Sequence, residues 1–157
     1  MEKSLNTLLQ ATFQMNSHAD NCAYWLLFNN FGNAGEIFHK KYAHKFPEWA
    51  DLISDLMIKL GYKPERLSLE ENNYNYSDYV ELFEDVEAEL EHYREIICRT
   101  IEIANTHNLR ELVGFLDDFL LELVDYKKQV RTWLIKAETT FNSSLGFDVY
   151  FESFTFI

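Results

Sequence analysis

The chain has 157 residues, which suits one domain with a single hydrophobic core. Its composition, 47% hydrophobic and 16% aromatic, excludes an intrinsically disordered protein. The formal net charge of -12 argues against DNA as a partner, because such a surface repels the phosphate backbone.

No segment is predicted to enter a membrane, since no apolar run approaches the roughly 20 residues of a transmembrane helix. The N-terminal residues contain neither a signal-peptide core nor a basic arm. Cys22 and Cys98 lack the spacing of a redox or metal motif and are predicted to be reduced thiols. The sequence therefore predicts a cytoplasmic protein without a membrane partner.

The first 60 residues are expected to form two helices. The first runs from about residue 4 to 30, and Gly32 is predicted to close it in the left-handed conformation. The second follows directly, with Asn33 as its N-cap and Glu36 in the capping-box position. Pro47 lies inside this second helix and predicts a kink or a short break after Phe46.

Two further helices are expected at about residues 77–105 and 108–137. The polar connection before them, residues 61–76, reaches roughly 50 Å when extended. A helix of about 27 residues spans only roughly 40 Å. The connection can therefore run the length of the bundle and leave the second and third helices parallel. This predicts an all-α, ferritin-like four-helix bundle with one long crossover between helices two and three.

The C-terminal segment is rich in aromatic side chains and has no helical period. We expect a bundle domain over residues 1–138 and an aromatic tail over residues 139–157. As an exposed patch the tail would mark an interaction surface, so it is predicted to pack as an extended segment on its own or a neighbouring subunit. The alternative is a docking peptide for another protein, built around the sequence SLGF at residues 144–147.

A histidine and three acids share the face of the second helix opposite its apolar side. His44, Glu48, Asp51 and Asp55 are spaced i, i+4, i+7 and i+11, which places them in one narrow stripe. Such a stripe is either solvated surface or half of a metal site that a neighbouring subunit completes. Carboxylate and imidazole ligands of this kind suit iron.

A di-iron site inside the bundle is the other candidate. The pairs Glu36/His39 and Glu89/His92, together with Glu122, have the residue types that such sites use. Helical phase, however, places Leu, Ile, Val and Phe at the inward positions, where an unpaired carboxylate would be costly. We therefore expect these acids to be solvated.

The spacing of the interface candidates resembles that of the Dps miniferritins, which are twelve-subunit ferritin-like shells. Members of that family carry Leu-His seven residues after a glycine, then Asp-x-x-x-Glu, with Leu-Gly ten residues beyond the aspartate. Here His39 stands seven residues after Gly32, Asp51 and Asp55 are four residues apart, and Gly61 stands ten beyond Asp51. The resemblance covers about residues 4–138.

The resemblance implies an iron site at a two-fold interface, with histidine from one subunit and acids from its partner. Carried over, the ligands are His39, Asp51 and Asp55, with Asp55 in place of a glutamate. The first-helix histidine of the family falls on Leu27, and Glu36 occupies the position that ungapped spacing assigns to the second histidine. The site is either rebuilt from Glu36, His44 or His18, or lost.

The resemblance also implies a function. The chain is expected to bind Fe²⁺, to oxidise it with peroxide or oxygen if the interface site is intact, and to store the ferric product in a homo-oligomeric shell of two-fold dimers. Such a ferroxidase protects a cell against oxidative stress. DNA binding is not expected, because the basic extension of some relatives is absent. The alternative, which Leu27 favours, is a non-enzymatic ferritin-like scaffold that has lost its metal site.

Overall fold

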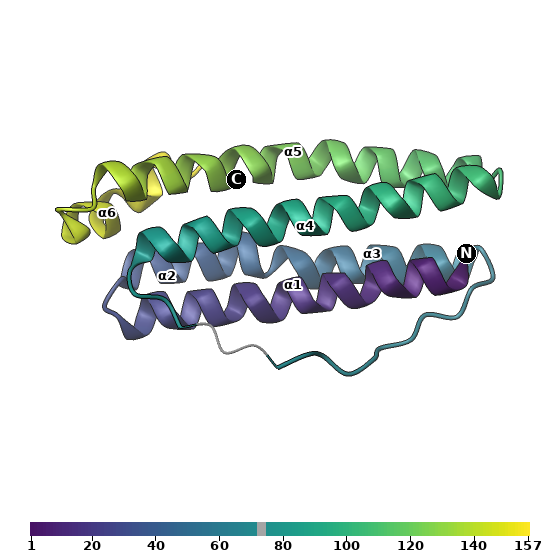
Figure 1. Ribbon diagram of the computed structural model, residues 1–157, viewed down its shortest axis with the longest axis horizontal. Helices are drawn as coiled ribbons and strands as arrows, with labels where there is room; N and C mark the ends of the chain where they lie inside the picture. Colours follow the sequence, from purple (N-terminus) through teal and green to yellow (C-terminus); the bar gives the residue numbers. More distant parts are fainter. Residues whose placement is uncertain (72–74) are drawn as a thin grey trace.

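The structure is a computed structural model that describes residues 1–71 and 75–157. Four long helical stretches run side by side, and a short helical segment covers one end of the bundle (Figure 1). The described residues contain no strand, in agreement with the predicted all-α fold. The helical elements are α1 (Glu2–Phe28), α2 (Gly32–Phe38), the π-helical turn η1 (His39–Ala43), α3 (Lys45–Lys59), α4 (Tyr79–Thr106), α5 (Arg110–Thr139), α6 (Ser144–Tyr150) and the 3-10 turn η2 (Phe151–Phe154).

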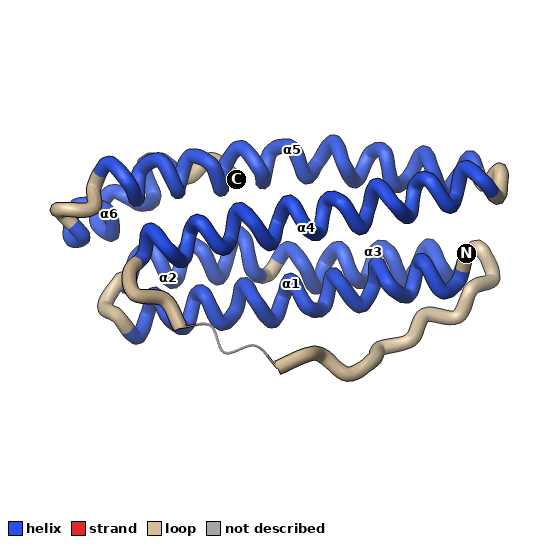
Figure 2. Tube along the Cα trace, viewed as in Figure 1, coloured by secondary structure: helices blue, strands red, loops and turns tan. Residues whose placement is uncertain are grey.

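The predicted four-helix topology is confirmed. α1 packs against α3 and α4, and the described part of the connection after α3, up to residue 71, runs along α1 (Figure 2). Interlocking aromatic rings fill the interior. The ring of Trp49 lies 5.0 Å from those of Phe119 and Tyr126, and the ring of Phe46 lies 5.9 Å from that of Tyr93.

Amide side chains of α1 hold the crossover against the bundle. Asn6, Gln10 and Gln14 are spaced four residues apart and therefore lie on one face of α1. Gln10 Nε2 donates to Ser68 O at 2.7 Å, and Gln14 exchanges two hydrogen bonds with the backbone of Glu70. These amides satisfy the backbone of a segment without regular structure. Residues 72–74, which fall within the predicted crossover, lie outside the described residues.

The chain reverses after α1 differently from the prediction. The left-handed residue is Asn30, with φ of 69°, and not Gly32. Asparagine tolerates this conformation because its side chain is short and polar. The capping box predicted at Asn33 and Glu36 is also wrong, because α2 already begins at Gly32, follows Phe31 in the N-cap position and has no side-chain cap.

The second helical stretch is broken, but not after Phe46 as the sequence predicts. The irregularity is the π turn η1, and Pro47 stands in the first turn of α3, where a missing N–H is tolerated. The proline leaves the carbonyl of Ala43, four residues earlier, without a helical donor. Asn16 Nδ2 on α1 donates to that oxygen at 3.2 Å. The break is therefore tied to α1 by a specific hydrogen bond.

The C-terminal tail packs on its own subunit as short helices, which corrects the predicted extended segment. α6 and η2 bury Phe147 and Phe151 completely, and Phe151 stacks on Trp133 with ring centroids 5.1 Å apart. Gln129 holds the last residues: its Nε2 donates to the carbonyl of residue 154, and its Oε1 accepts from the amides of residues 156 and 157. Because Phe147 is buried, the SLGF segment is not free to act as a docking peptide.

Candidate metal site

The two histidines of the second helical stretch lie against each other because of the π turn. In an α-helix, side chains five residues apart point about 140° away from each other. In η1 the N–H of His44 donates to the carbonyl of His39, five residues earlier, at 3.1 Å. The two rings meet with centroids 4.4 Å apart, and the side chain of His39 is 33% exposed. Turns of this type are frequent at functional sites.

Asp20 on α1 faces this histidine pair. Its Oδ1 lies 3.2 Å from His39 Nε2, without the alignment of a hydrogen bond. This oxygen is buried and accepts no hydrogen bond, which is costly for a carboxylate. Tyr24, one turn further along α1, places its ring centroid 6.0 Å from that of His39. The arrangement places one carboxylate next to two imidazoles, with the Asp20 oxygen paired to His39 Nε2.

The residues of α1 beside His39 are thus Asp20 and Tyr24, while the position that the family spacing assigns to the first-helix histidine is Leu27. Leu27 covers Gly35, where an added Cβ would approach Leu27 Cγ to 2.7 Å. Asp20, Tyr24 and Leu27 are spaced i, i+4 and i+7 and share one face of α1.

Asp51 and Asp55 stand apart from the histidines within one chain. Both are exposed on α3, one helical turn from each other. They follow His44 by seven and eleven residues, or about 10 and 16 Å along the helix axis. Glu36 is exposed one turn before His39, on α2. The structure therefore places His39 and His44 together, but not with the two aspartates.

A family model of the ferritin-like domain matches residues 2–140, which include α1 to α5. The chain belongs to the ferritin-like family.

The fold is similar to those of PmFTN variants in iron-soaked crystals. One variant, soaked for 45 min, has a TM-score of 0.89 at 14% identity, with 94% of this chain and 96% of that chain covered. A second, soaked for 5 min, has the same TM-score and identity and covers 94% and 97%. A third, soaked overnight, has a TM-score of 0.86 at 13% identity and covers 91% and 92%. Identity this low establishes the fold alone.

No curated protein sequence matches this ferritin-like chain. None of its described helices combines the length and the apolar character needed to span a bilayer.

The interior of this ferritin-like bundle does not gather the acids of the internal candidate site. Glu122 accepts from Trp49 Nε1 at 3.3 Å and pairs with Lys45 Nζ at 2.8 Å. Glu89 and His92 line a pocket beneath the crossover. Within residues 1–71 and 75–157, no three His, Cys, Asp or Glu side chains are placed to hold a metal ion.

His18, the remaining candidate ligand, belongs to a separate cluster. It is only 1% exposed, and its Nε2 lies 2.9 Å from Asp85 Oδ2, which also accepts a hydrogen bond from Tyr76 Oη. Burial lowers the pKa of His18, but the hydrogen bond to Asp85 and the neighbouring Cys22 raise it to about 10. The hydrogen bond with His18 in turn holds the pKa of Asp85 below its usual value. His18 is therefore engaged with Asp85 and Cys22 in a cluster separate from the pair His39 and His44.

Proposed function

We propose that this chain binds Fe²⁺ as a substrate at an interface between two copies and oxidises it there. Asp20, His39 and His44 of one copy face Asp51 and Asp55 of the other. The observation that carries the proposal is the edge-on contact of His39 with His44 beside Asp20, whose Oδ1 lies 3.2 Å from His39 Nε2. Imidazole nitrogens with carboxylate oxygens form a donor set that suits ferrous iron.

The need for a second copy follows from the geometry of α3. Asp51 lies about 10 Å beyond His44 along the helix axis, too far for one ion to bridge. In a two-fold pair, the same patch of each copy meets its own image, so the acids of one copy lie opposite the histidines of the other. Apolar surface flanks the histidine half and the aspartate half of the proposed site. Phe28 beside the first is 87% exposed and Leu52 beside the second is 50% exposed, and such pairing would bury both.

The residues divide the chemistry between them. The imidazoles position Fe²⁺, and the carboxylates favour the more highly charged ferric product. Two Fe²⁺ ions each give one electron to one peroxide molecule, which takes up two protons and leaves as two water molecules. Storage of the product in a Dps-like homo-oligomeric shell, and with it protection against oxidative stress, extends this proposal. The match to the ferritin-like family supports that extension.

Oxidation of Fe²⁺ by the purified protein with peroxide added as the oxidant tests the proposal, and the oligomeric state is measured in parallel. Oxidation above the rate in buffer is expected for the wild type and is expected to be lost in His39→Ala and in Asp51→Ala. Asp118→Ala removes an exposed acid from α5 and serves as the matched control, with no change expected. An assembled wild-type protein that oxidises Fe²⁺ no faster than buffer contradicts the proposal.

A non-enzymatic scaffold is the second candidate function. The exposed apolar side chains Tyr24, Phe28 and Leu52 favour it, because a protein contact explains them without any metal. This reading predicts a stable oligomer, no retained iron, and assembly that is unchanged in His39→Ala.

A further inference from the structure

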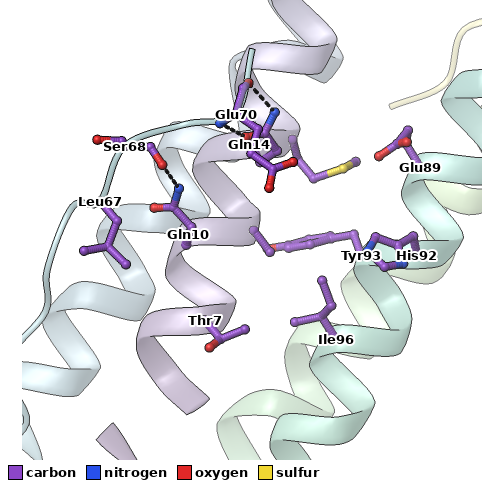
Figure 3. Close-up of a pocket in the computed structure, with 12 residues that line it drawn as sticks. Thr7, Gln10, Gln14, Leu67, Ser68, Glu70, Glu89, His92, Tyr93 and Ile96 are labelled. Atoms are coloured by element: carbon purple, nitrogen blue, oxygen red, sulfur yellow. Dashed lines mark hydrogen bonds between the residues drawn. The ribbon is translucent and has the colours of Figure 1, made fainter. Parts of the chain in front are cut away.

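A pocket of about 390 Å³ opens between α1, α4 and the crossover (Figure 3). Its volume lies within the roughly 300–1,000 Å³ that is typical of small-molecule sites. Ala11, Met15, Leu67 and Ile96 supply apolar walls. Figure 3 shows the amides of Gln10 and Gln14 reaching across to the crossover, with Glu89, His92 and Tyr93 on the opposite side.

One polar atom of this pocket lacks a partner. Gln10 Nε2 donates to Ser68 O at 2.7 Å, which fixes the orientation of the amide. Gln10 Oε1 is buried and accepts no hydrogen bond from the described residues. The hydroxyl of Tyr93 is already hydrogen-bonded to Thr12 Oγ1 at 2.6 Å. The pocket therefore offers a desolvated acceptor that a ligand N–H can satisfy.

The charge of the pocket favours a cation. Glu70 and Glu89 line it, and no lysine or arginine does. Neither carboxylate belongs to an ion pair with another described residue. A metal ion fits less well than an organic cation, because no three metal-binding side chains of the described residues converge here. The apolar walls also stabilise a hydrocarbon body and contribute nothing to a hydrated ion.

We propose that this pocket binds a small organic cation, namely a protonated primary amine on a short aliphatic chain. The ammonium group pairs with the carboxylates of Glu89 and Glu70, while the aliphatic part packs against the apolar walls and extends toward Gln10 on the opposite side. This inference is independent of the iron proposal, because none of the pocket residues is a ligand of the proposed interface site.

Isothermal titration calorimetry of the full chain tests this proposal, with isopentylamine as the probe. Isopentanol has the same hydrocarbon body without the charge and is expected to bind at least about tenfold more weakly. Glu89→Gln is expected to weaken amine binding by about tenfold. Glu102→Gln makes the same change at an exposed position of α4 outside the pocket and is expected to leave the affinity unchanged.

Ala11→Phe distinguishes the contribution of the cavity to binding from that of its charges, because it fills the pocket and keeps every carboxylate. It is expected to abolish amine binding, with helical content checked by circular dichroism. Glu89→Gln decides the question if Ala11→Phe does not fold. The proposal is overturned if isopentylamine does not bind, if amine and alcohol bind equally, or if Glu89→Gln has no effect. It is also overturned in favour of a metal site if Mn²⁺ alone binds, Glu89→Gln abolishes that binding and the amine does not bind.

Discussion

The rings of His39 and His44 meet edge-on with centroids 4.4 Å apart because η1 closes a hydrogen bond over five residues. An α-helix would point these two side chains in different directions. The extra residue of the π turn thus brings the rings of the two histidines into contact. It does so opposite Asp20, whose buried Oδ1 has no hydrogen-bond donor.

Replacing His44 with alanine is expected to weaken Fe²⁺ binding at least about tenfold, because it removes one imidazole and frees the ring of His39 to rotate. Anaerobic Fe²⁺ titration measures the affinity. His107, exposed at the C-cap of α4, provides the matched control. An equal loss in His107→Ala would show that the effect is not specific to the pair His39 and His44.

Asn16→Ala is expected to destabilise the chain by about 1–3 kcal/mol, because it leaves the carbonyl of Ala43 buried without a donor. Pro47→Ala restores an N–H four residues after Ala43 and can replace the lost donor. The effect of Asn16→Ala on the free energy of unfolding in urea should therefore be smaller in the Pro47→Ala background. Strict additivity of the two substitutions would contradict this explanation of the break.

Phe151→Ala is expected to reduce the free energy of unfolding by about 3–5 kcal/mol, since the ring is completely buried against Trp133. Tyr150→Ala, at the adjacent position, removes a ring that is 64% exposed and should change stability by less than about 0.5 kcal/mol. Chemical denaturation of the two variants compares them directly. Similar effects at both positions would mean that the tail does not pack on the bundle in solution.

Lowering the pH should weaken the contact that Asp85 makes between α4 and α1. The hydrogen bond with His18 lowers the pKa of Asp85, so its ionised form stabilises the fold above its ordinary pKa of 3.8. That contribution is lost as the pH falls through the lower pKa of the folded state. We expect Asp85→Asn to cost about 3 kcal/mol near pH 6, with the difference from wild type shrinking below about pH 4. A difference that stays constant down to pH 2 would contradict this assignment.

The long helices could be predicted because each carries apolar side chains at the helical period, and because the length of the crossover restricts the topology. The tail could not. α6 has seven residues, too few to show a period, and the burial of Phe147 depends on the rings at the end of the bundle.

The candidate site was predicted only in part. The histidines and the aspartate stripe were visible as spacings, but nothing local to the sequence marks η1 as a π turn. Asp20 lies in no motif, and its position beside His39 depends on how α1 packs against the second helical stretch. The role of His18 could not be predicted for a similar reason, because its partner Asp85 is 67 residues away in the sequence.

Mixing two inactive variants tests most directly whether the iron site is shared between copies. In a mixed two-fold pair of His39→Ala and Asp51→Ala, one interface site keeps both residues and the other loses both. A shared site predicts that neither variant alone oxidises Fe²⁺ above buffer, while co-expressed copies that pair at random recover about a quarter of the wild-type rate. Mixed oligomers that remain as inactive as either variant would contradict a site shared between copies.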